Sequence, residues 1–301
     1  MALSPNLRGA LFMAVSMAGF TINDTFVKAA SSGMNPGQIM FVRGLFATIM
    51  IAAMSWRMGA LRPLSFLAKP GVIARSVGEL GAALTFIWAL AHMPLGNASA
   101  ILQALPLAVT LGAVLFFGEK VGWRRWAAIA AGFLGVMIIV RPGMEGFTRY
   151  SLLVLACVLA AAFRDLSTRR APPEVPTLFL SLVTAGLICV GGLALIIPFG
   201  GWTPMTGKSL LQMFAAASFL IVGYLFVIRA MREGEIGFIA PFRYTSLVWA
   251  LGLGYVVFHD VPEPLTLAGA ALVIGSGVYA FYREGVRKHK IASAVPPEPA
   301  A

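Results

Sequence analysis

The sequence predicts an all-α integral membrane protein whose ten transmembrane helices form two inverted five-helix repeats. Three observations lead to this fold class. The chain of 301 residues is 59% hydrophobic and only 12% charged, whereas soluble domains are about 25% charged. It contains ten apolar runs long enough to cross about 30 Å of hydrocarbon. Finally, its two halves can be aligned with each other at one constant offset.

The ten runs are joined by mostly short connections, which leave no room for a soluble domain. The first run could be read as a cleaved signal peptide, but it contains Asn23 and Asp24 and nine more spans follow it, so we expect it to be retained. The final segment, 284–301, is expected to be a disordered cytoplasmic tail. The runs lie at residues 9–30, 36–55, 71–91, 96–117, 123–141, 150–168, 177–198, 209–230, 237–258 and 263–282.

The net charge of +11 suggests nucleic-acid binding at first sight, but the basic residues are placed as topology signals. Alternate connections divide them between two sides. One side has 15, namely Arg8, Arg57, Arg62, Lys69, Lys120, Arg124, Arg125, Arg169, Arg170, Arg229, Arg232, Arg283, Arg287, Lys288 and Lys290, and the other has 4, namely Lys28, Arg141, Arg149 and Lys208. By the positive-inside rule both termini are cytoplasmic. We expect a multi-pass protein of the bacterial inner membrane, with the lipid bilayer and not nucleic acid as its partner.

An internal repeat fixes the predicted architecture. At an offset of 141 residues Asp24 aligns with Asp165, and Glu119 aligns with Asp260. Each half has five spans, an odd number, so the second half must enter the membrane upside down relative to the first. This predicts repeats at 8–141 and 149–283, with a substrate site near the membrane midplane between them.

The ninth run, Gly237–Phe258, is the most informative single stretch. It carries Pro241 and Arg243 within an apolar sequence. A charge there is costly, from about 2.5 kcal/mol upward, so the guanidinium should face a protein-lined or watery interior. Proline removes a backbone hydrogen bond at the same depth. Together they predict a central cavity.

The order and spacing of several stretches are similar to a known family. The chain resembles EamA-type members of the drug/metabolite transporter superfamily over about residues 8 to 284. This resemblance implies a ten-helix fold with both termini inside and a central cavity, without ATP hydrolysis. The second half departs from the first just before the shared aspartate. Arg164 precedes Asp165 in the second half, whereas Asn23 precedes Asp24 in the first. The resembling stretches are GALFMAVSMAGFTINDTFVK, GQIMFVRGLFA, FIWALAHMPLGNASAI, LFFGEKVGWRRWAAIAAGFLGVMIIVRPG and FIAPFRYTSLVWALGLGYVVFHDVPEPLTLAGAALVIGSGVYAFYRE.

Five polar or aromatic residues at membrane depth are the predicted substrate contacts. Arg43 and Arg243 would be the cationic contacts. Trp88, Gln103 and Tyr244 would stack on the ligand or form hydrogen bonds with it. The alternatives are a structural ion pair for Arg43 and interfacial anchoring or core packing for the aromatic residues.

Four further charged residues are candidates for coupling or gating. Asp24 is expected either to pair with Arg43 or to take up a proton when a substrate displaces that partner. Glu79 lies four residues after Arg75, so the two could satisfy each other on one helix face, or Glu79 could couple proton and substrate movement. Arg164 and Asp165, near the cytoplasmic end of the sixth span, are predicted to form a gate.

Several other chemistries lack support in the sequence. The two cysteines, Cys157 and Cys189, lie inside spans and are expected to be packing residues. There is no phosphate-binding GxxxxGK[ST] loop, HExxH or GxSxG motif, and we expect neither a metal nor a cofactor. An intramembrane enzyme would need Asp24 and Asp165 at one site, which their places at opposite ends of inverted halves disfavour. No polar ring of the kind that a channel needs is found.

These features predict a secondary transporter, not an enzyme, that moves a small organic metabolite by alternating access. Cations and aromatic groups inside would suit an aromatic or anionic ligand. Relatives of the EamA type include riboflavin importers, S-adenosylmethionine transporters and exporters of amino acids and other metabolites. Riboflavin uptake is the preferred prediction, and the other two are alternatives. The sequence leaves open whether the protein forms a homodimer.

Overall fold

The computed structural model describes residues 4–69, 71–118, 122–142, 148–168, 170, 172, 174–233 and 235–294. Lys120 and Arg169, which enter the charge count, and the end of the predicted tail, 295–301, lie outside these residues. All regular structure within the described residues is helical. The helices are α1 (Pro5–Ala30), α2 (Pro36–Arg57), η1 (Leu64–Ala68), α3 (Val72–Leu90), α4 (Leu95–Leu102), α5 (Leu105–Phe117), α6 (Trp123–Val140), α7 (Arg149–Thr168), α8 (Thr177–Ile196), α9 (Gly207–Glu233), α10 (Ile236–Ile239), η2 (Ala240–Tyr244), α11 (Thr245–Phe258) and α12 (Pro264–Ala294).

The first two helices begin with matching capping sequences. The Ser4 hydroxyl accepts a hydrogen bond from the Leu7 amide at 3.3 Å, and the Asn35 side chain accepts one from the Gln38 amide at 2.8 Å. A proline follows each cap in the first helical turn, where its missing N–H costs nothing. The apolar sequence then continues for five or more turns, so both helices are long enough to span a membrane.

Seven helical segments are long and apolar enough to cross a membrane, within the described part of the chain. These are α1, α2, α3, α7, α8, α9 and the segment formed by α4 and α5. Shorter apolar helical stretches, Trp126–Val140 in α6 and Pro264–Ala280 in α12, match two more predicted spans. The remaining predicted span is divided into α10, η2 and α11. Helix α12 continues to Ala294, so the predicted tail is helical over its first residues.

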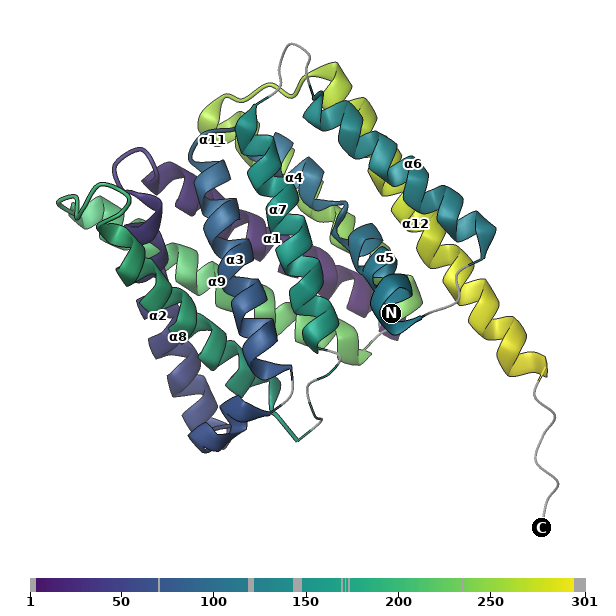
Figure 1. The fold of residues 1–301 in the computed structure, drawn as a ribbon, viewed down its shortest axis with the longest axis horizontal. Helices are drawn as coiled ribbons and strands as arrows, with labels where there is room; N and C mark the ends of the chain where they lie inside the picture. The colour runs from purple at the N-terminus through teal and green to yellow at the C-terminus, as the bar shows by residue number, and fades with distance from the viewer. Residues whose placement is uncertain are drawn as a thin grey trace.

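Helices from the two halves of the sequence alternate in the bundle. The most extensive pairings are α1 with α9, α2 with α8, α3 with α7 and α6 with α12, and the last pair runs along one side of the molecule (Figure 1). Glycines allow close approach: a Cβ added to Gly19 would lie 3.0 Å from the carbonyl oxygen of Phe219, and one added to Gly78 would lie 3.0 Å from that of Ala160. The largest buried hydrophobic cluster includes residues from every α-helix except the short α10. The halves therefore form one packed body.

Candidate functional site

The fourth and ninth predicted spans are both interrupted, and they contact each other close to these interruptions. Helix α4 ends at Leu102, and α5 begins three residues later, at Leu105, with Pro106 in its first turn. The ninth span, predicted as one run, is broken by η2, which contains Pro241. Proline cannot donate the helical hydrogen bond, which explains both interruptions. The buried Gln103 amide nitrogen donates to the Ser246 hydroxyl at 2.8 Å, so the two broken helices are joined close to their breaks.

A narrow cleft lies between α2, α3, α8 and α9. Its empty space is about 410 Å³, including the part at its open mouth. It extends from the middle of these helices toward the end of α2 and the beginning of α8. The lining residues are Arg43, Gly44, Ala47, Ile51, Arg75, Glu79, Ser181, Thr184, Ala185, Ile188, Leu220 and Tyr224. The cleft therefore combines apolar walls with three charged side chains.

Arg43 is the deepest-buried charged residue of the cleft, with 8% of its surface exposed. One terminal nitrogen, Nη1, donates to the side-chain oxygen of Asn23 at 3.0 Å, and the Asn23 amide nitrogen donates to Asp24 at 2.8 Å. The expected pairing of Arg43 with Asp24 is therefore indirect, because Asn23 bridges the two side chains, whose charges still attract each other. Arg43 Nε is buried and has no hydrogen-bond partner among the described residues. Much of its donor capacity is unused.

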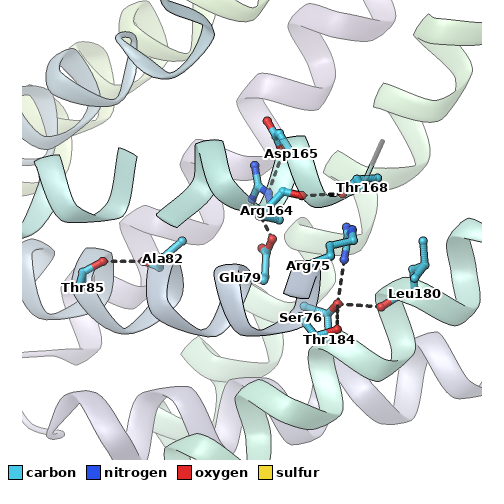
Figure 2. A network of polar contacts seen from close by, with 10 residues as sticks. All are labelled: Arg75, Ser76, Glu79, Ala82, Thr85, Arg164, Asp165, Thr168, Leu180 and Thr184. Carbon is cyan, nitrogen blue, oxygen red and sulfur yellow. Dashed lines mark hydrogen bonds and ion pairs between the residues drawn. The ribbon is translucent and has the colours of Figure 1, made fainter. Parts of the chain in front are cut away.

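Arg75 is held in the same way by a neutral partner. Its Nη1 donates to the Thr184 hydroxyl at 2.8 Å, and that hydroxyl donates to the Leu180 carbonyl at 2.7 Å (Figure 2). Ser76 lies 3.5 Å from the same Thr184 oxygen. Arg75 Nε is also buried without a hydrogen-bond partner in the described part of the chain. Thus two arginines of one cleft are each bonded to a neutral oxygen.

Glu79 bonds across the helix interface and not along its own helix. Arg164 Nη1 of α7 lies 2.8 Å from Glu79 Oε2, and Arg164 Nε lies 2.7 Å from Asp165 Oδ1 (Figure 2). The prediction that Arg75 and Glu79 satisfy each other is wrong, because the interhelical partner is a better one. Interhelical charge-assisted bonds in a partly buried site outweigh an exposed pair spaced four residues apart, which contributes only about 0.3–0.5 kcal/mol. Arg164 therefore links the two halves of the chain.

The structure separates the other predicted substrate contacts from this cleft. The Trp88 ring packs edge to face on Phe199, with 4.4 Å between ring centroids. The Tyr244 hydroxyl is buried against Gly277 of α12, where an added Cβ would overlap it. Arg243 is exposed and, like Gln103, is not a lining residue of the cleft. Of the predicted substrate contacts, only Arg43 lines it.

Sequence reasoning missed the contribution of the seventh and eighth spans. Thr184 of α8 and Tyr224 of α9 line the cleft opposite the two arginines. Tyr224 was one of several aromatic residues at membrane depth, and Thr184 gave no signal, because threonine is common in apolar helices. Within the described residues no group of three or more His, Cys, Asp and Glu side chains could hold a metal ion.

Comparison with known proteins places the chain among membrane transporters. Residues 7–141 and 148–282 each match the model of the EamA-like transporter family. The pseudopaline exporter CntI of Pseudomonas aeruginosa strain UCBPP-PA14 is 27% identical over 88% of this chain and 93% of its own length. A riboflavin transporter of Rhizobium johnstonii is 31% identical over 67% of each chain.

Two further similarities cover nearly the whole chain. An S-adenosylmethionine uptake transporter of Rickettsia felis is 23% identical over 96% of this chain and 98% of its own. A crystal structure of another protein superposes with a TM-score of 0.61 and 19% sequence identity, covering 94% of this chain and 98% of that one. The structural match extends to the whole helical fold.

Proposed function

We propose, because this chain belongs to the EamA-like transporter family, that it is a secondary transporter that moves a small organic metabolite across the bacterial inner membrane by alternating access. The chain is a multi-pass membrane protein of a transporter family. The observation that carries the proposal is the cleft between the halves, whose lining combines apolar and neutral polar side chains with Arg43, Arg75 and Glu79. Charged groups at this depth are expensive and usually mark a substrate or ion pathway.

An inverted repeat is part of this proposal. At the offset of 141 residues, the contact of Gly19 with Phe219 corresponds to that of Ala160 with Gly78, and both are close backbone approaches. The pairing of α1 with α9 likewise corresponds to that of α7 with α3. The two interrupted spans are also equivalent, because Gln103 aligns with Tyr244. We propose repeat boundaries at 8–141 and 149–283, and rocking of one repeat against the other as the transport movement.

The basic residues support an orientation with both termini in the cytoplasm. The mouth of the cleft lies toward the end of α2 that carries Arg57, on the side rich in basic residues. In this orientation the cleft opens to the cytoplasm. Arg164 and Asp165 lie toward the same side, which supports their role as a gate there, with Arg164 bonded to Glu79 in this open arrangement.

Riboflavin uptake is the substrate and direction that we propose first, because one relative with that name shares 31% identity. S-adenosylmethionine uptake and metabolite export are the alternatives, supported by the names of other relatives. The cleft provides Tyr224 as an aromatic group, whereas Trp88 and Tyr244 pack elsewhere. S-adenosylmethionine carries a positive sulfonium, which two arginines would repel, and a carboxylate, which they would attract.

Uptake of labelled riboflavin by cells unable to make it tests this proposal. The cells would carry the intact protein, the Arg43→Gln variant or the Arg57→Gln variant, in which an exposed arginine of the same helix is changed. We expect saturable uptake that Arg43→Gln abolishes and Arg57→Gln leaves intact. If uptake is absent, S-adenosylmethionine uptake and efflux from metabolite-loaded cells are measured next. Correctly inserted protein that moves no metabolite in either direction would refute the transporter proposal.

A further inference from the structure

We infer that the cleft recognises an oxyanion group of its substrate, a carboxylate or phosphate, which binds between Arg43 and Arg75. This inference rests on the proposed transport function and names the chemical class of the ligand. It starts from two guanidinium groups that line one cleft and that neutral oxygens hold in place. Each keeps a buried Nε–H group without a partner among the described residues.

Three other cations in the described part of the bundle provide a contrast, although Arg243, like the cleft arginines, has no carboxylate within ion-pair distance there. Lys28 lies 3.9 Å from Asp260, Arg141 lies 2.5 Å from Glu263, and Arg164 lies between Glu79 and Asp165. These cations are therefore near carboxylates of the protein. The described residues provide no carboxylate within ion-pair distance of Arg43 or Arg75. Asp24 and Glu79 act on Arg43 only at longer range, so both guanidinium groups keep donors for a ligand.

Glu79 would oppose this binding if its charge were free. It lines the same cleft, but its carboxylate is bonded to Arg164 at 2.8 Å. Arg164 thereby offsets the negative charge that Glu79 would otherwise direct at an entering anion. Both arginines line the same cleft, and an oxyanion that enters it would pair their unused donors.

The second half of the chain provides complementary neutral groups. The Thr184 hydroxyl already orients Arg75, and Tyr224 lines the wall of α9. If the arginines of α2 and α3 hold the anionic group of a ligand, the rest of that ligand could therefore contact α8 and α9. Such a ligand would bridge the two halves. A neutral ligand, riboflavin included, would leave the guanidinium donors unpaired and desolvated, so an oxyanion site would favour an anionic metabolite over the riboflavin that we propose first.

Matched pairs of probes that differ in charge test the inference by direct binding. The purified full chain in detergent is titrated with benzoate and benzamide, and with riboflavin 5′-phosphate and riboflavin, by calorimetry. In at least one pair we expect the anion to bind about 10-fold or more tightly than its neutral partner. The comparison of benzoate with benzamide tests whether the cleft binds a carboxylate, and the comparison of the two flavins tests whether it binds a phosphate.

Variants then assign the preference to the cleft. Arg43→Gln and Arg75→Gln should each weaken binding of the preferred anion by about 10- to 100-fold, whereas Arg57→Gln, at an exposed site of α2, should leave it unchanged. Arg75→Lys keeps the charge and should restore part of the affinity. Melting temperatures without ligand identify any variant that is misfolded.

Two results would overturn the inference. One is equal affinity for both members of every pair, and the other is an anion preference that survives in well-folded Arg43→Gln and Arg75→Gln. If the neutral partner is also transported, the proposed function stands and the anion site alone is wrong. If no probe binds and no metabolite is transported in either direction, both fail together.

Discussion

Replacing Arg164 by glutamine would test the charged link between α3 and α7. Its guanidinium bonds Glu79 at 2.8 Å and Asp165 at 2.7 Å. The Arg164 and Glu79 side chains are 21% and 15% exposed, so water screens their bond only in part, and Asp165 at 32% is screened more. Arg164→Gln leaves both carboxylates without a cation. Glu79→Gln, by contrast, keeps an amide oxygen that can still accept from Arg164.

The bonds set the size of the expected effect. A hydrogen bond to a charged group contributes about 1.5–3 kcal/mol, and the exposure of Asp165 reduces its share. We therefore expect Arg164→Gln to lower the free energy of unfolding by about 3 kcal/mol and Glu79→Gln to lower it by about 1 kcal/mol. At about 2–4 °C per kcal/mol, the melting temperature should fall by about 6–12 °C and 2–4 °C respectively.

A double-mutant cycle measures the pair directly. Thermal unfolding of the purified protein in detergent is compared for the parent, both single variants and the double variant. The double variant should cost about 1.5 kcal/mol less than the sum of the single variants, because Glu79→Gln also removes the carboxylate that Arg164→Gln alone leaves without a cation. Additivity within about 0.5 kcal/mol would show that Glu79 and Arg164 do not interact, and would refute the argument.

Three further predictions concern packing, the broken helices and topology. Gly78→Leu should destabilise the protein by about 1–3 kcal/mol or prevent folding, because the larger side chain pushes α3 away from α7. In the same unfolding assay, Gly186→Ala should stabilise the protein slightly, because Gly186 of α8 faces open space. Gln103→Leu should lower the melting temperature by a few degrees, because it loses the bond to α11 and costs about 1 kcal/mol. In a cysteine-free background, a membrane-impermeant maleimide applied to whole cells should label Lys208→Cys but not Arg57→Cys, and the reverse pattern would invert the proposed topology.

The helical elements could be predicted from the sequence because hydrocarbon allows few alternatives. Apolar runs of about 20 residues must form helices, since no other partner satisfies their backbone groups. The predicted run 36–55 is observed as Pro36–Arg57, and 177–198 as Thr177–Ile196. Pro241 indicated that the ninth run lacks a backbone hydrogen bond, but not that the run would be divided into α10, η2 and α11. The break beside Gln103 was missed: Pro106 lies within the predicted run 96–117, but in the structure it occupies the first turn of a new helix that begins at Leu105.

The partners of the charged residues could not be predicted, because they depend on which helices pack together. Sequence spacing brings Arg75 and Glu79 within reach of each other on one helix, but α7 places Arg164 beside Glu79. Similarly, Asp24 was the expected partner of Arg43, and the amide of Asn23 lies between them. The position of Arg43 in an apolar run did identify a cleft residue, since burial of a charge requires a polar surrounding whatever its partner.

The two repeats would not be mechanically equivalent, and the difference lies at one pair of positions. At the offset of 141 residues, Glu79 and Arg164 correspond to Leu220 and Asn23. An ion pair therefore joins α3 to α7, whereas the equivalent positions of α1 and α9 cannot form one. Under alternating access, a movement that breaks the pair would be opposed by about 1.5 kcal/mol, a factor of about 13 in population. Either the ligand supplies that energy, or α3 and α7 stay together as a pivot while other helices move. Because Glu79 also lines the cleft, the same carboxylate would respond to the charge of the ligand and hold the two halves together.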